Sequence, residues 1–219
     1  YIPQRKTDSD SFRKVFVSRF ENGKILSADY SQIELRLLAH ISNDANMIRA
    51  FREGVDVHPS PAATVFGVAE SAVTSELRKR AKAVNFGIMY GIGAFSLSDD
   101  IGVSRAEAQA YIDQYLAGYP GIDAYLKETI QKAYEDGYVT TVFGRRRAIP
   151  ELSAQNKNLK HFGERVAMNS PIQGTAADII KIAMIRVDRA LKDSGYDARL
   201  ILQVHDELIV ECHRDHRDE

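Results

Sequence analysis

The chain has 219 residues, of which 44% are hydrophobic and 27% are charged. This is enough to bury a core and is typical of one or two globular domains, which excludes a disulfide-stapled miniprotein, a disordered chain and a collagen-like repeat. The formal net charge of −1 at pH 7 also excludes a uniformly basic nucleic-acid binder. Any binding of nucleic acid must therefore depend on local groups.

The sequence contains no stretch of eighteen consecutive apolar residues and no signal-peptide pattern at its start. Its one cysteine, Cys212, cannot form an internal disulfide, which agrees with a reducing compartment. We expect a cytoplasmic protein that does not bind membranes. Because the chain starts without Met and stops in a charged run directly after a strand pattern, we also expect it to be a piece of a longer protein.

The first predicted element is a short buried strand over residues 24–30, with Asp29 near its C-terminal end. The sequence Ser31-Gln32-Ile33-Glu34 matches an S-x-x-E capping box, which predicts that a helix begins there. Residues 43–95 are mostly helical in pattern, and their longest periodic run covers residues 74–90.

Two further helices are predicted in the middle of the chain. A second capping box at Ser104 and Glu107 opens a helix that ends near residues 118–121, and the next helix runs to Asp136, with Gly137 as its stop. Residues 138–150 resemble a hairpin. The helical pattern over residues 157–193 contains Pro171, and we expect the helix to break there.

Two β-rich runs, residues 199–204 and 207–211, follow and are joined by His205 and Asp206, which predicts a tight hairpin. We expect this hairpin to have no neighbouring strand within the chain. The fold class is therefore predicted to be α+β, with a helical middle inserted between two β-containing parts.

Three groups of residues are candidates for catalysis or for the binding of a metal or a ligand. The first surrounds Asp29, because a carboxylate at the end of a buried strand and beside a helix N-terminus can hold a hard cation. The alternative for Asp29 is an ordinary turn aspartate, and the capping box alone would explain Glu34.

The second group consists of side chains that recur every four residues: Arg78, Lys82, Phe86 and Tyr90. On a helix they form one stripe of two cations followed by two aromatic rings. Such a stripe suits a nucleotide, because cations bind phosphates and rings pack on a sugar or a base. The alternative is a solvated basic face whose aromatic residues belong to the core.

The third group is Gln203-Val204-His205-Asp206-Glu207. Polar hairpin turns are common, so a simple turn is one interpretation. However, a two-residue turn favours Gly or Asn, and this turn has neither. We therefore expect His205 and Asp206 to be present for a reason other than turn formation.

In this order, the three groups closely resemble motifs A, B and C of family A DNA polymerases of the bacterial DNA polymerase I type. The resemblance continues through Asp56-Val57-His58, through Phe143-Gly144-Arg145-Arg146-Arg147, and through the segment from Arg165 to Asp178, so it covers essentially the whole chain. It implies a right-hand polymerase fold: a palm with an antiparallel sheet and helices, carrying a helical fingers insertion. Residues 1–55 and 151–219 would belong to the palm and residues 56–150 to the fingers, and the thumb would be absent.

The resemblance also implies the roles of individual residues. Asp29 and Asp206 would hold two Mg²⁺ ions together with the carbonyl of Tyr30, and Lys82 would join these two carboxylates in catalysis. The residues implied to bind the incoming nucleotide are Gln32, Glu34, His58, Arg78, Lys82, Phe86 and Tyr90. The residues implied to contact the primer-template DNA are Arg165, Asn169, Gln173 and His205.

The implied function is template-directed DNA synthesis from deoxynucleoside triphosphates by two-metal-ion nucleotidyl transfer, in replication or repair, by a monomer. An alternative is a catalytically incompetent fragment that binds nucleic acid or nucleotides. A two-metal nuclease would also use carboxylates, but it would not need the stripe that begins at Arg78. We expect the isolated chain to synthesise DNA weakly or not at all.

Overall fold

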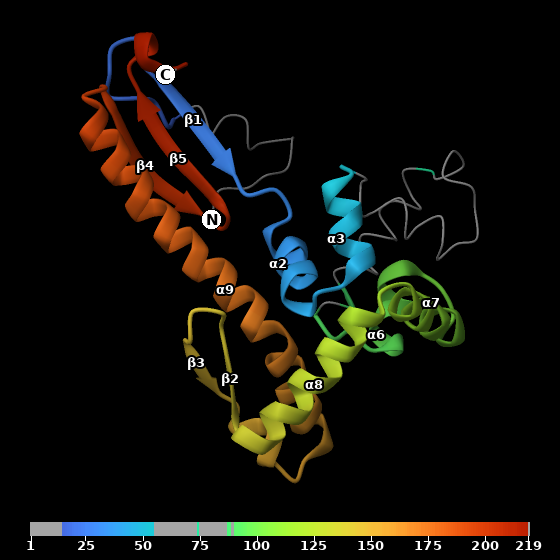
Figure 1. Cartoon of the computed structure of the whole chain (residues 1–219). Helices are drawn as coiled ribbons and strands as arrows, with labels where there is room; N and C mark the ends of the chain where they lie inside the picture. The colour runs from blue at the N-terminus through green and yellow to red at the C-terminus, as the bar shows by residue number, and fades with distance from the viewer. Residues whose placement is uncertain (1–14, 55–73, 75–86, 89, 219) are drawn as a thin grey trace. The chain divides into compact units, whose positions relative to one another are not determined.

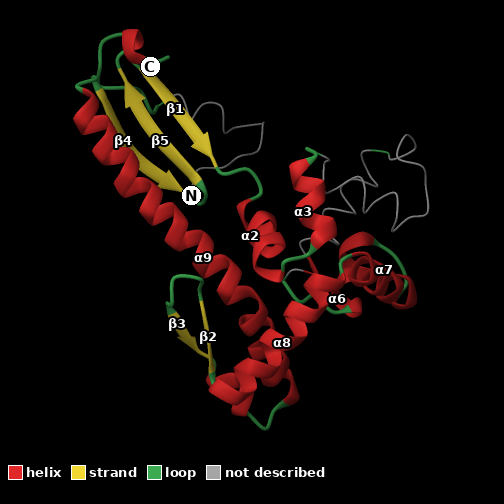
Figure 2. Ribbon diagram, in the orientation of Figure 1, coloured by secondary structure: helices red, strands yellow, loops and turns green. Residues whose placement is uncertain are grey.

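The computed structural model describes residues 15–54, 74, 87–88 and 90–218 (Figure 1). It consists of helices and antiparallel strands (Figure 2), which confirms the α+β fold class. The chain divides into two compact units. The first unit contains Tyr1–Ile33 and Ala177–Glu219, and the second contains Glu34–Ala176. Within the described residues, no helix has the length and apolar character that crossing a membrane requires. Most of the predicted helical run over residues 74–90 lies outside the described residues.

A three-stranded antiparallel sheet forms the centre of the first unit. Its strands are β1 (Lys24–Asp29), β4 (Ala198–Val204) and β5 (Glu207–Cys212), in the order β1-β5-β4. The pairing of β4 with β5 confirms the hairpin predicted over residues 199–211. The expectation that this hairpin has no neighbouring strand is wrong, because β5 also pairs with the whole of β1. The central position of β5 explains why Leu208 and Cys212 are buried whereas most of β1 is exposed.

A segment before β1 is tied to this sheet by a buried charge. Glu211 on β5 is only 3% exposed. It forms an ion pair with the guanidinium of Arg19 and accepts a hydrogen bond of 3.1 Å from the Arg19 backbone N–H. The pairing matters because a buried carboxylate without a partner would be strongly destabilising.

Helices dominate the second unit. They are α2 (Ile33–Ser42), α3 (Ala45–Arg52), α6 (Ala94–Ile101), α7 (Arg105–Gly118) and α8 (Pro120–Asp136). The predicted capping box at the start of α7 is confirmed, because Glu107 N–H donates to Ser104 Oγ and Ser104 N–H donates to the Glu107 carboxylate. Gly137 ends α8 in a left-handed conformation, as predicted.

The capping box predicted at Ser31 is wrong. The box would require Gln32 to take a helical conformation, but Gln32 has a φ of 55° and α2 begins only at Ile33. The first turn is closed instead by a hydrogen bond from Ile33 N–H to the Tyr30 carbonyl. The Glu34 carboxylate is used elsewhere, as the acceptor of a hydrogen bond from the Tyr90 hydroxyl.

The predicted break at Pro171 is also wrong, because α9 (Lys157–Ser194) continues through this residue. Proline removes one helix hydrogen bond and usually costs about 3 kcal/mol in a helix interior. Buried residues on both sides of it, Ala167, Ile172 and Ala176, supply packing that offsets this cost.

A short hairpin of β2 (Tyr138–Thr140) and β3 (Arg146–Ala148), followed by the 3₁₀ helix η2 (Pro150–Ser153), precedes α9 and confirms the predicted hairpin. Its inner residues join α8 and α9 in one hydrophobic cluster. The members of this cluster are Ala133, Val139, Ile149, Leu152 and Ala167, with Val166 packed against them.

The buried carboxylate of Asp44 accepts hydrogen bonds from backbone N–H groups at the N-termini of two helices in this unit. Its Oδ1 accepts a hydrogen bond of 2.9 Å from Met47 N–H in α3, and its Oδ2 accepts one of 2.8 Å from Gly121 N–H in α8. The side chain of Asn46 adds a hydrogen bond to the Gly118 carbonyl. Asp44 is therefore the N-cap of α3 and also fixes α3 against the start of α8.

We predict that Asp44→Ala lowers the free energy of unfolding by about 2 to 3 kcal/mol, because the buried Met47 N–H and the partly buried Gly121 N–H lose a charged acceptor. Asp44→Asn keeps one side-chain oxygen and should lose less. Urea unfolding measures both values. Asp100→Ala on the exposed face of α6 is the matched control and should change the free energy by about 0.5 kcal/mol or less. Equal losses for Asp44→Ala and Asp100→Ala would contradict the double role of Asp44.

Candidate functional site

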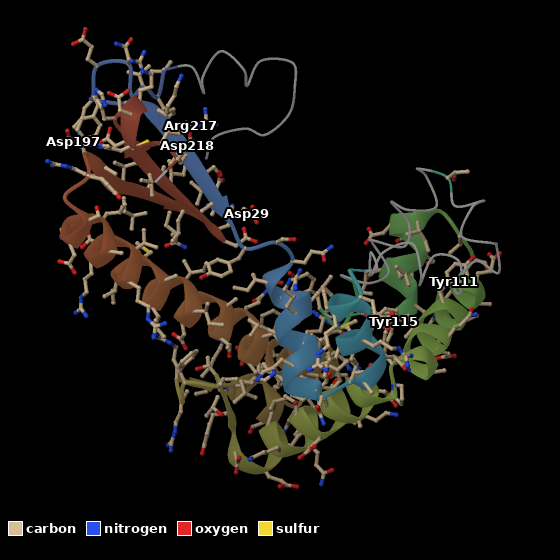
Figure 3. All side chains as sticks on the ribbon, turned by 45° about the horizontal axis from the view of Figure 1, so that its top comes forward. Asp29, Tyr111, Tyr115, Asp197, Arg217 and Asp218 are labelled. Atoms are coloured by element: carbon tan, nitrogen blue, oxygen red, sulfur yellow. The ribbon has the colours of Figure 1, made fainter. Side chains whose placement is uncertain are left out.

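Carboxylates gather at one end of the three-stranded sheet. The register of β1 and β5 places Asp29 directly opposite Glu207, and Asp206 precedes Glu207 in the turn. The Tyr30 N–H donates a hydrogen bond of 3.1 Å to the Asp206 carbonyl, so the pairing of these two segments continues beyond the last residue of β1. Asp29 itself is exposed at this end of the strand (Figure 3). The sheet therefore brings the two aspartates of the first and third sequence groups together.

The electrostatics of this end favour a bound cation. Partial loss of water raises the pKa of the Asp29 carboxyl above its ordinary value, and repulsion from Asp206 and then Glu207 raises it further. Neighbouring carboxylates raise each other's pKa values because each ionised group disfavours charge on the next. A positive charge between them would relieve this repulsion.

The donor set fits Mg²⁺ in kind. Within the described residues, no group of three or more His, Cys, Asp or Glu side chains is arranged to hold a metal ion. Mg²⁺ does not need such a group, because it commonly keeps several waters and takes one or two carboxylates together with substrate phosphates. Asp29 and Asp206 are a pair of this kind, and Tyr30, which follows Asp29 in the sequence, could add its backbone carbonyl.

Two residues beside the carboxylates have unusual backbone conformations. Among the described non-glycine residues, positive φ occurs at Asn22, Asn43, Gln32 and His205. Asparagine, aspartate and histidine are enriched in this conformation, whereas other side chains, such as that of Gln32, adopt it at a cost of about 1 kcal/mol or more. Both Gln32 and His205 are predicted site residues. A hydrogen bond of 2.7 Å from Gln203 Nε2 to the His205 carbonyl supports the turn.

A second cluster lies in the other unit and contains residues predicted to bind the nucleotide and the DNA. The Tyr90 hydroxyl donates to the Glu34 carboxylate and is also hydrogen-bonded to the Gln173 side chain. Asn169 Nδ2 donates to the Tyr90 carbonyl at 3.3 Å. The structure therefore joins Glu34, Tyr90, Asn169 and Gln173 in one network.

The pKa of Tyr90 determines whether its hydroxyl can act as a hydrogen-bond donor in this network. Burial, the hydrogen bond with Glu34 and the negative charge of Glu34 together raise the pKa of Tyr90 to about 12, although the hydrogen bond with Gln173 acts in the opposite direction. The hydroxyl therefore stays protonated at neutral pH and remains a donor to Glu34. This contact fixes the Glu34 side chain in the second unit.

The predicted DNA-contacting residues Arg165, Asn169 and Gln173 are spaced by four residues on α9, so they form one stripe along the helix. Gly91 packs directly against this stripe, since a Cβ atom at Gly91 would lie 2.2 Å from Met168 Cε and 3.1 Å from Arg165 Cγ. Arg165 and Gln173 are exposed. Among the described residues, the buried Asn169 Oδ1 accepts no hydrogen bond.

Four of the predicted site residues, His58, Arg78, Lys82 and Phe86, lie outside the described residues. The structure also brings Glu207 to the site, a residue of the third sequence group for which the sequence predicted no role. Its carboxylate accepts a hydrogen bond from the Ser27 hydroxyl and faces Asp29 across the sheet. Only the strand register reveals this position, and a motif alone does not supply the register.

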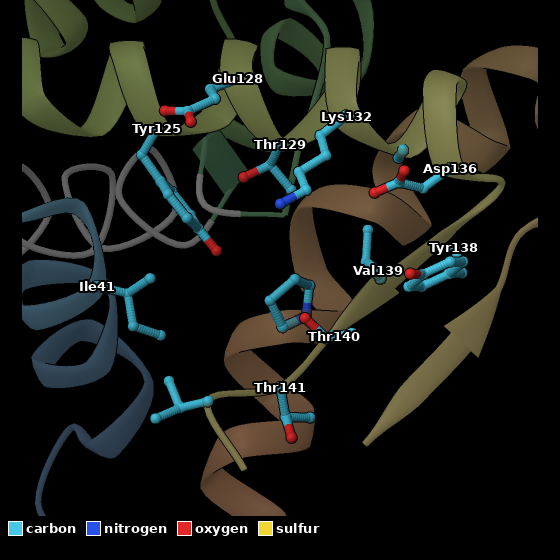
Figure 4. Close-up of a pocket in the computed structure, with 13 residues that line it drawn as sticks. Ile41, Tyr125, Glu128, Thr129, Lys132, Asp136, Tyr138, Val139, Thr140 and Thr141 are labelled. Carbon is cyan, nitrogen blue, oxygen red and sulfur yellow. The ribbon is translucent and has the colours of Figure 1, made fainter. Parts of the chain in front are cut away.

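The same unit as the Tyr90 network has a cavity of about 490 Å³ between α8, β2, Ile41 and Pro171 (Figure 4). Its polar lining includes Tyr125, Thr129, Lys132 and Asp136 of α8. Among the residues that the structure describes, none of those predicted for the site lines it. A smaller cavity of about 170 Å³ is lined by Arg145, Arg146 and Arg147 and also by Gln173.

The sequence and the fold were compared with known proteins. A family model described as DNA polymerase family A matches residues 1–219. The chain is 52% identical over 211 residues to DNA polymerase I of Streptococcus pneumoniae serotype 4. This match covers 96% of this chain and 24% of that relative. The chain is 53% identical over 211 residues to DNA polymerase I of Bacillus subtilis, with the same coverage. The chain thus spans about a quarter of the length of these relatives.

A solved structure resembles the fold closely. The POL domain of Pol1 from M. smegmatis, in complex with a DNA primer-template and dNTP, is 44% identical to this chain. The match has a TM-score of 0.92 and covers 99% of this chain and 38% of that chain.

We predict that Asp29→Asn stabilises the metal-free protein at pH 7. The folded-state pKa of Asp29 is raised, so ionised Asp29 destabilises the fold at a pH above its folded pKa, and this cost disappears below its unfolded pKa of about 3.9. The variant should melt about 1 to 3 °C higher at pH 7 and should lose this gain in acid.

Thermal unfolding over a pH series without divalent metal measures the effect. Asp188→Asn is the control in the same unit, because the Asp188 carboxylate pairs with Lys192 at 2.6 Å and its loss should give no gain. Identical pH profiles for the wild type and Asp29→Asn would show that the carboxylates do not repel each other in the fold.

Proposed function

Because the chain belongs to DNA polymerase family A, we propose that it is the part of a DNA polymerase that adds deoxynucleotides to a primer 3′-hydroxyl as a template directs. The observation that carries the proposal is the meeting of Asp29 and Asp206 at one end of the sheet. The relatives named DNA polymerase I and the primer-template and dNTP bound in the solved POL domain support it.

We assign the parts of a right-hand polymerase as the resemblance implies. Residues 1–55 and 151–219 are palm, and residues 56–150 are fingers. The thumb lies outside these 219 residues. The sheet of β1, β4 and β5 supports the palm assignment, because it presents carboxylates from two strands at one exposed end.

We propose that Asp29, Asp206 and the carbonyl of Tyr30 hold two Mg²⁺ ions. When bound, such ions lower the pKa of the primer hydroxyl and stabilise the charge on the triphosphate and the leaving pyrophosphate. The raised pKa of Asp29 supports the assignment, because partial loss of water and then repulsion from Asp206 and Glu207 disfavour its charged form, and a cation would offset both. The contribution of the protein is to hold these oxygens at fixed positions in adjacent strands.

The nucleotide-binding assignment combines described and undescribed residues. We propose that Glu34 excludes the ribose 2′-hydroxyl, and that Tyr90 holds Glu34 in place and lies near the templating base. The hydrogen bond between Tyr90 and Glu34 supports this pairing. The remaining assigned residues follow the family resemblance: Gln32, His58, Arg78 and Lys82 for the nucleotide and its triphosphate, with Lys82 also catalytic, and Phe86 for the sugar.

We propose that Arg165, Asn169, Gln173 and His205 contact the primer-template duplex. The four-residue spacing of the first three along α9 supports this assignment, because it places them on one stripe of the helix. Donors and acceptors shared by all base pairs in the minor groove permit contacts that do not depend on sequence. The active species is a monomer, and its substrates are deoxynucleoside triphosphates and primer-template DNA.

We predict that Asp206→Ala in the full-length protein lowers primer extension by at least about a hundredfold, because displacement of reacting groups by about 1 Å already costs this much. The affinity for primer-template DNA should change little. Extension of a labelled primer and DNA binding by fluorescence anisotropy measure the two effects. Asp193→Ala on α9 is the control, and it should extend primers at the wild-type rate.

Extension by Asp206→Ala at the wild-type rate would refute the metal assignment. Wild-type protein that binds primer-template but never extends it would favour the alternative function, a catalytically incompetent segment that binds nucleic acid.

We predict that Glu34→Ala admits ribonucleotides, because the smaller side chain leaves room for a 2′-hydroxyl. Tyr90→Phe keeps the Glu34 side chain but removes its hydrogen-bond donor, so it should relax sugar selection less. Competition between dGTP and GTP on one template measures the ratio of incorporation. Sugar selection that is unchanged in both variants would remove Glu34 from this role and leave only a structural one.

A further inference from the structure

The β2–β3 hairpin has a composition unlike the rest of the chain. Residues 138–176, which include this hairpin and the first part of α9, carry six lysine and arginine residues and two acidic residues, whereas the whole chain has a net charge of −1. Three of the cations, Arg145, Arg146 and Arg147, are consecutive and exposed. A local excess of this kind binds anions even in a chain without overall positive charge.

Two of these arginines, Arg146 and Arg147, are not neutralised by acidic neighbours. Within the described residues, neither of them forms an ion pair with a carboxylate. The guanidinium of Arg146 lies 4.8 Å from the centre of the Tyr138 ring, which fixes its position and leaves its charge available. Of the two acidic residues nearby, Glu164 is occupied by hydrogen bonds with Tyr134 and His161.

The hairpin is held rigidly against the stripe on α9. Val142 N–H donates to Thr175 Oγ1 at 3.1 Å, and Thr175 Oγ1 donates to the Pro171 carbonyl at 2.5 Å. Gly174 permits this approach, because a Cβ atom there would lie 2.6 Å from Thr141 Cγ2. The positions of the arginines relative to α9 are therefore determined by packing of buried groups.

The arginines and the stripe share a hollow. The cavity of about 170 Å³ is lined by Arg145, Arg146 and Arg147 on one side and by Ser170, Gln173 and Gly174 of α9 on the other. Guanidinium groups bind phosphate through paired N–H donors. Phe143, exposed beside the arginines at the hairpin tip, adds an aromatic face of the kind that stacks on bases.

We propose that the β2–β3 hairpin is a phosphate-binding element that holds the backbone of the nucleic acid whose bases face Asn169 and Gln173. Arg146 and Arg147 supply the charge, and Thr175 positions the hairpin. This inference rests on the proposed function for the identity of the nucleic acid. It adds to that function a set of contacts that fix the polynucleotide without reading its sequence.

The test uses the full-length protein and a labelled primer-template duplex. Binding constants are measured by fluorescence anisotropy over a series of salt concentrations for the wild type and for the double variant Arg146→Gln, Arg147→Gln. Removal of one arginine–phosphate interaction should reduce the slope of log K against log salt by about 0.9, so the double variant should reduce it by about 1 to 2. An unchanged slope overturns the inference.

Three control variants sharpen the result. Lys127→Gln removes one exposed charge from α8 in the same unit and should leave the slope unchanged; an equal reduction would indicate a general charge effect and overturn the inference. Arg146→Lys with Arg147→Lys should keep most of the slope. Thr175→Val should weaken binding while keeping the number of charges. The same binding constant as the wild type would refute the positioning role of Thr175.

Inorganic pyrophosphate distinguishes the source of the phosphate. If the double variant weakens competition by pyrophosphate but leaves duplex binding unchanged, the site serves free phosphate and the assignment to nucleic acid is wrong. Primer extension by the wild type is measured in parallel. A reduced salt slope without any wild-type extension overturns only the proposed function, whereas wild-type extension with an unchanged slope overturns only the hairpin inference.

Discussion

The backbone ladder between β1 and β5 holds Asp29 opposite Glu207 and next to Asp206, although like charges at neighbouring positions repel. A shift of the register by one residue would turn every side chain of β1 to the other face of the sheet. The register resists such a shift because β5 is the central strand and pairs on both edges. Folding therefore concentrates negative charge at this end, and a cation there would lower the free energy of the folded chain.

The network around Tyr90 uses a different principle. Here a neutral donor, kept protonated by a pKa of about 12, meets a carboxylate, so the two groups attract rather than repel. The hydrogen bond restricts the position of the Glu34 carboxylate. Gln173 completes the chain of hydrogen bonds from α9. The proposed exclusion of the 2′-hydroxyl by Glu34 would benefit from such restriction, because a mobile side chain can move aside.

Local patterns predicted those elements whose determinants lie within a few residues. The Ser104 capping box and the Gly137 stop are local, and both are confirmed. The Ser31 box failed because Gln32 takes a left-handed conformation and the Glu34 carboxylate instead accepts a hydrogen bond from Tyr90, which is distant in the sequence. Pro171 did not break α9 because packing on both sides of it outweighed a local rule. Tertiary contacts decided both cases.

Part of the candidate site could likewise be predicted from local motifs, and part depends on tertiary packing. The motifs around Asp29 and Asp206 identified the carboxylates, but the sequence could not give the register that adds Glu207. Likewise, the run Arg145-Arg146-Arg147 was visible as part of a family resemblance. Its location beside Gln173 depends on how the hairpin packs against α9 through Thr141 and Gly174. No periodicity in the sequence encodes such packing between distant segments.

The turn at His205 shows that stability is not maximal at the proposed metal site. Glycine would adopt its φ of 55° without steric cost, whereas histidine, although enriched in this conformation among non-glycine residues, is less favourable there than glycine. Gln32, which follows the Tyr30 carbonyl by two residues, has the same left-handed conformation. Strained backbone is a common feature of functional sites, where the side chain or the path of the chain is needed. Since both strained residues border the aspartates, the strain and the electrostatic repulsion fall on the same few residues, and both are tolerated because the sheet fixes the backbone around them.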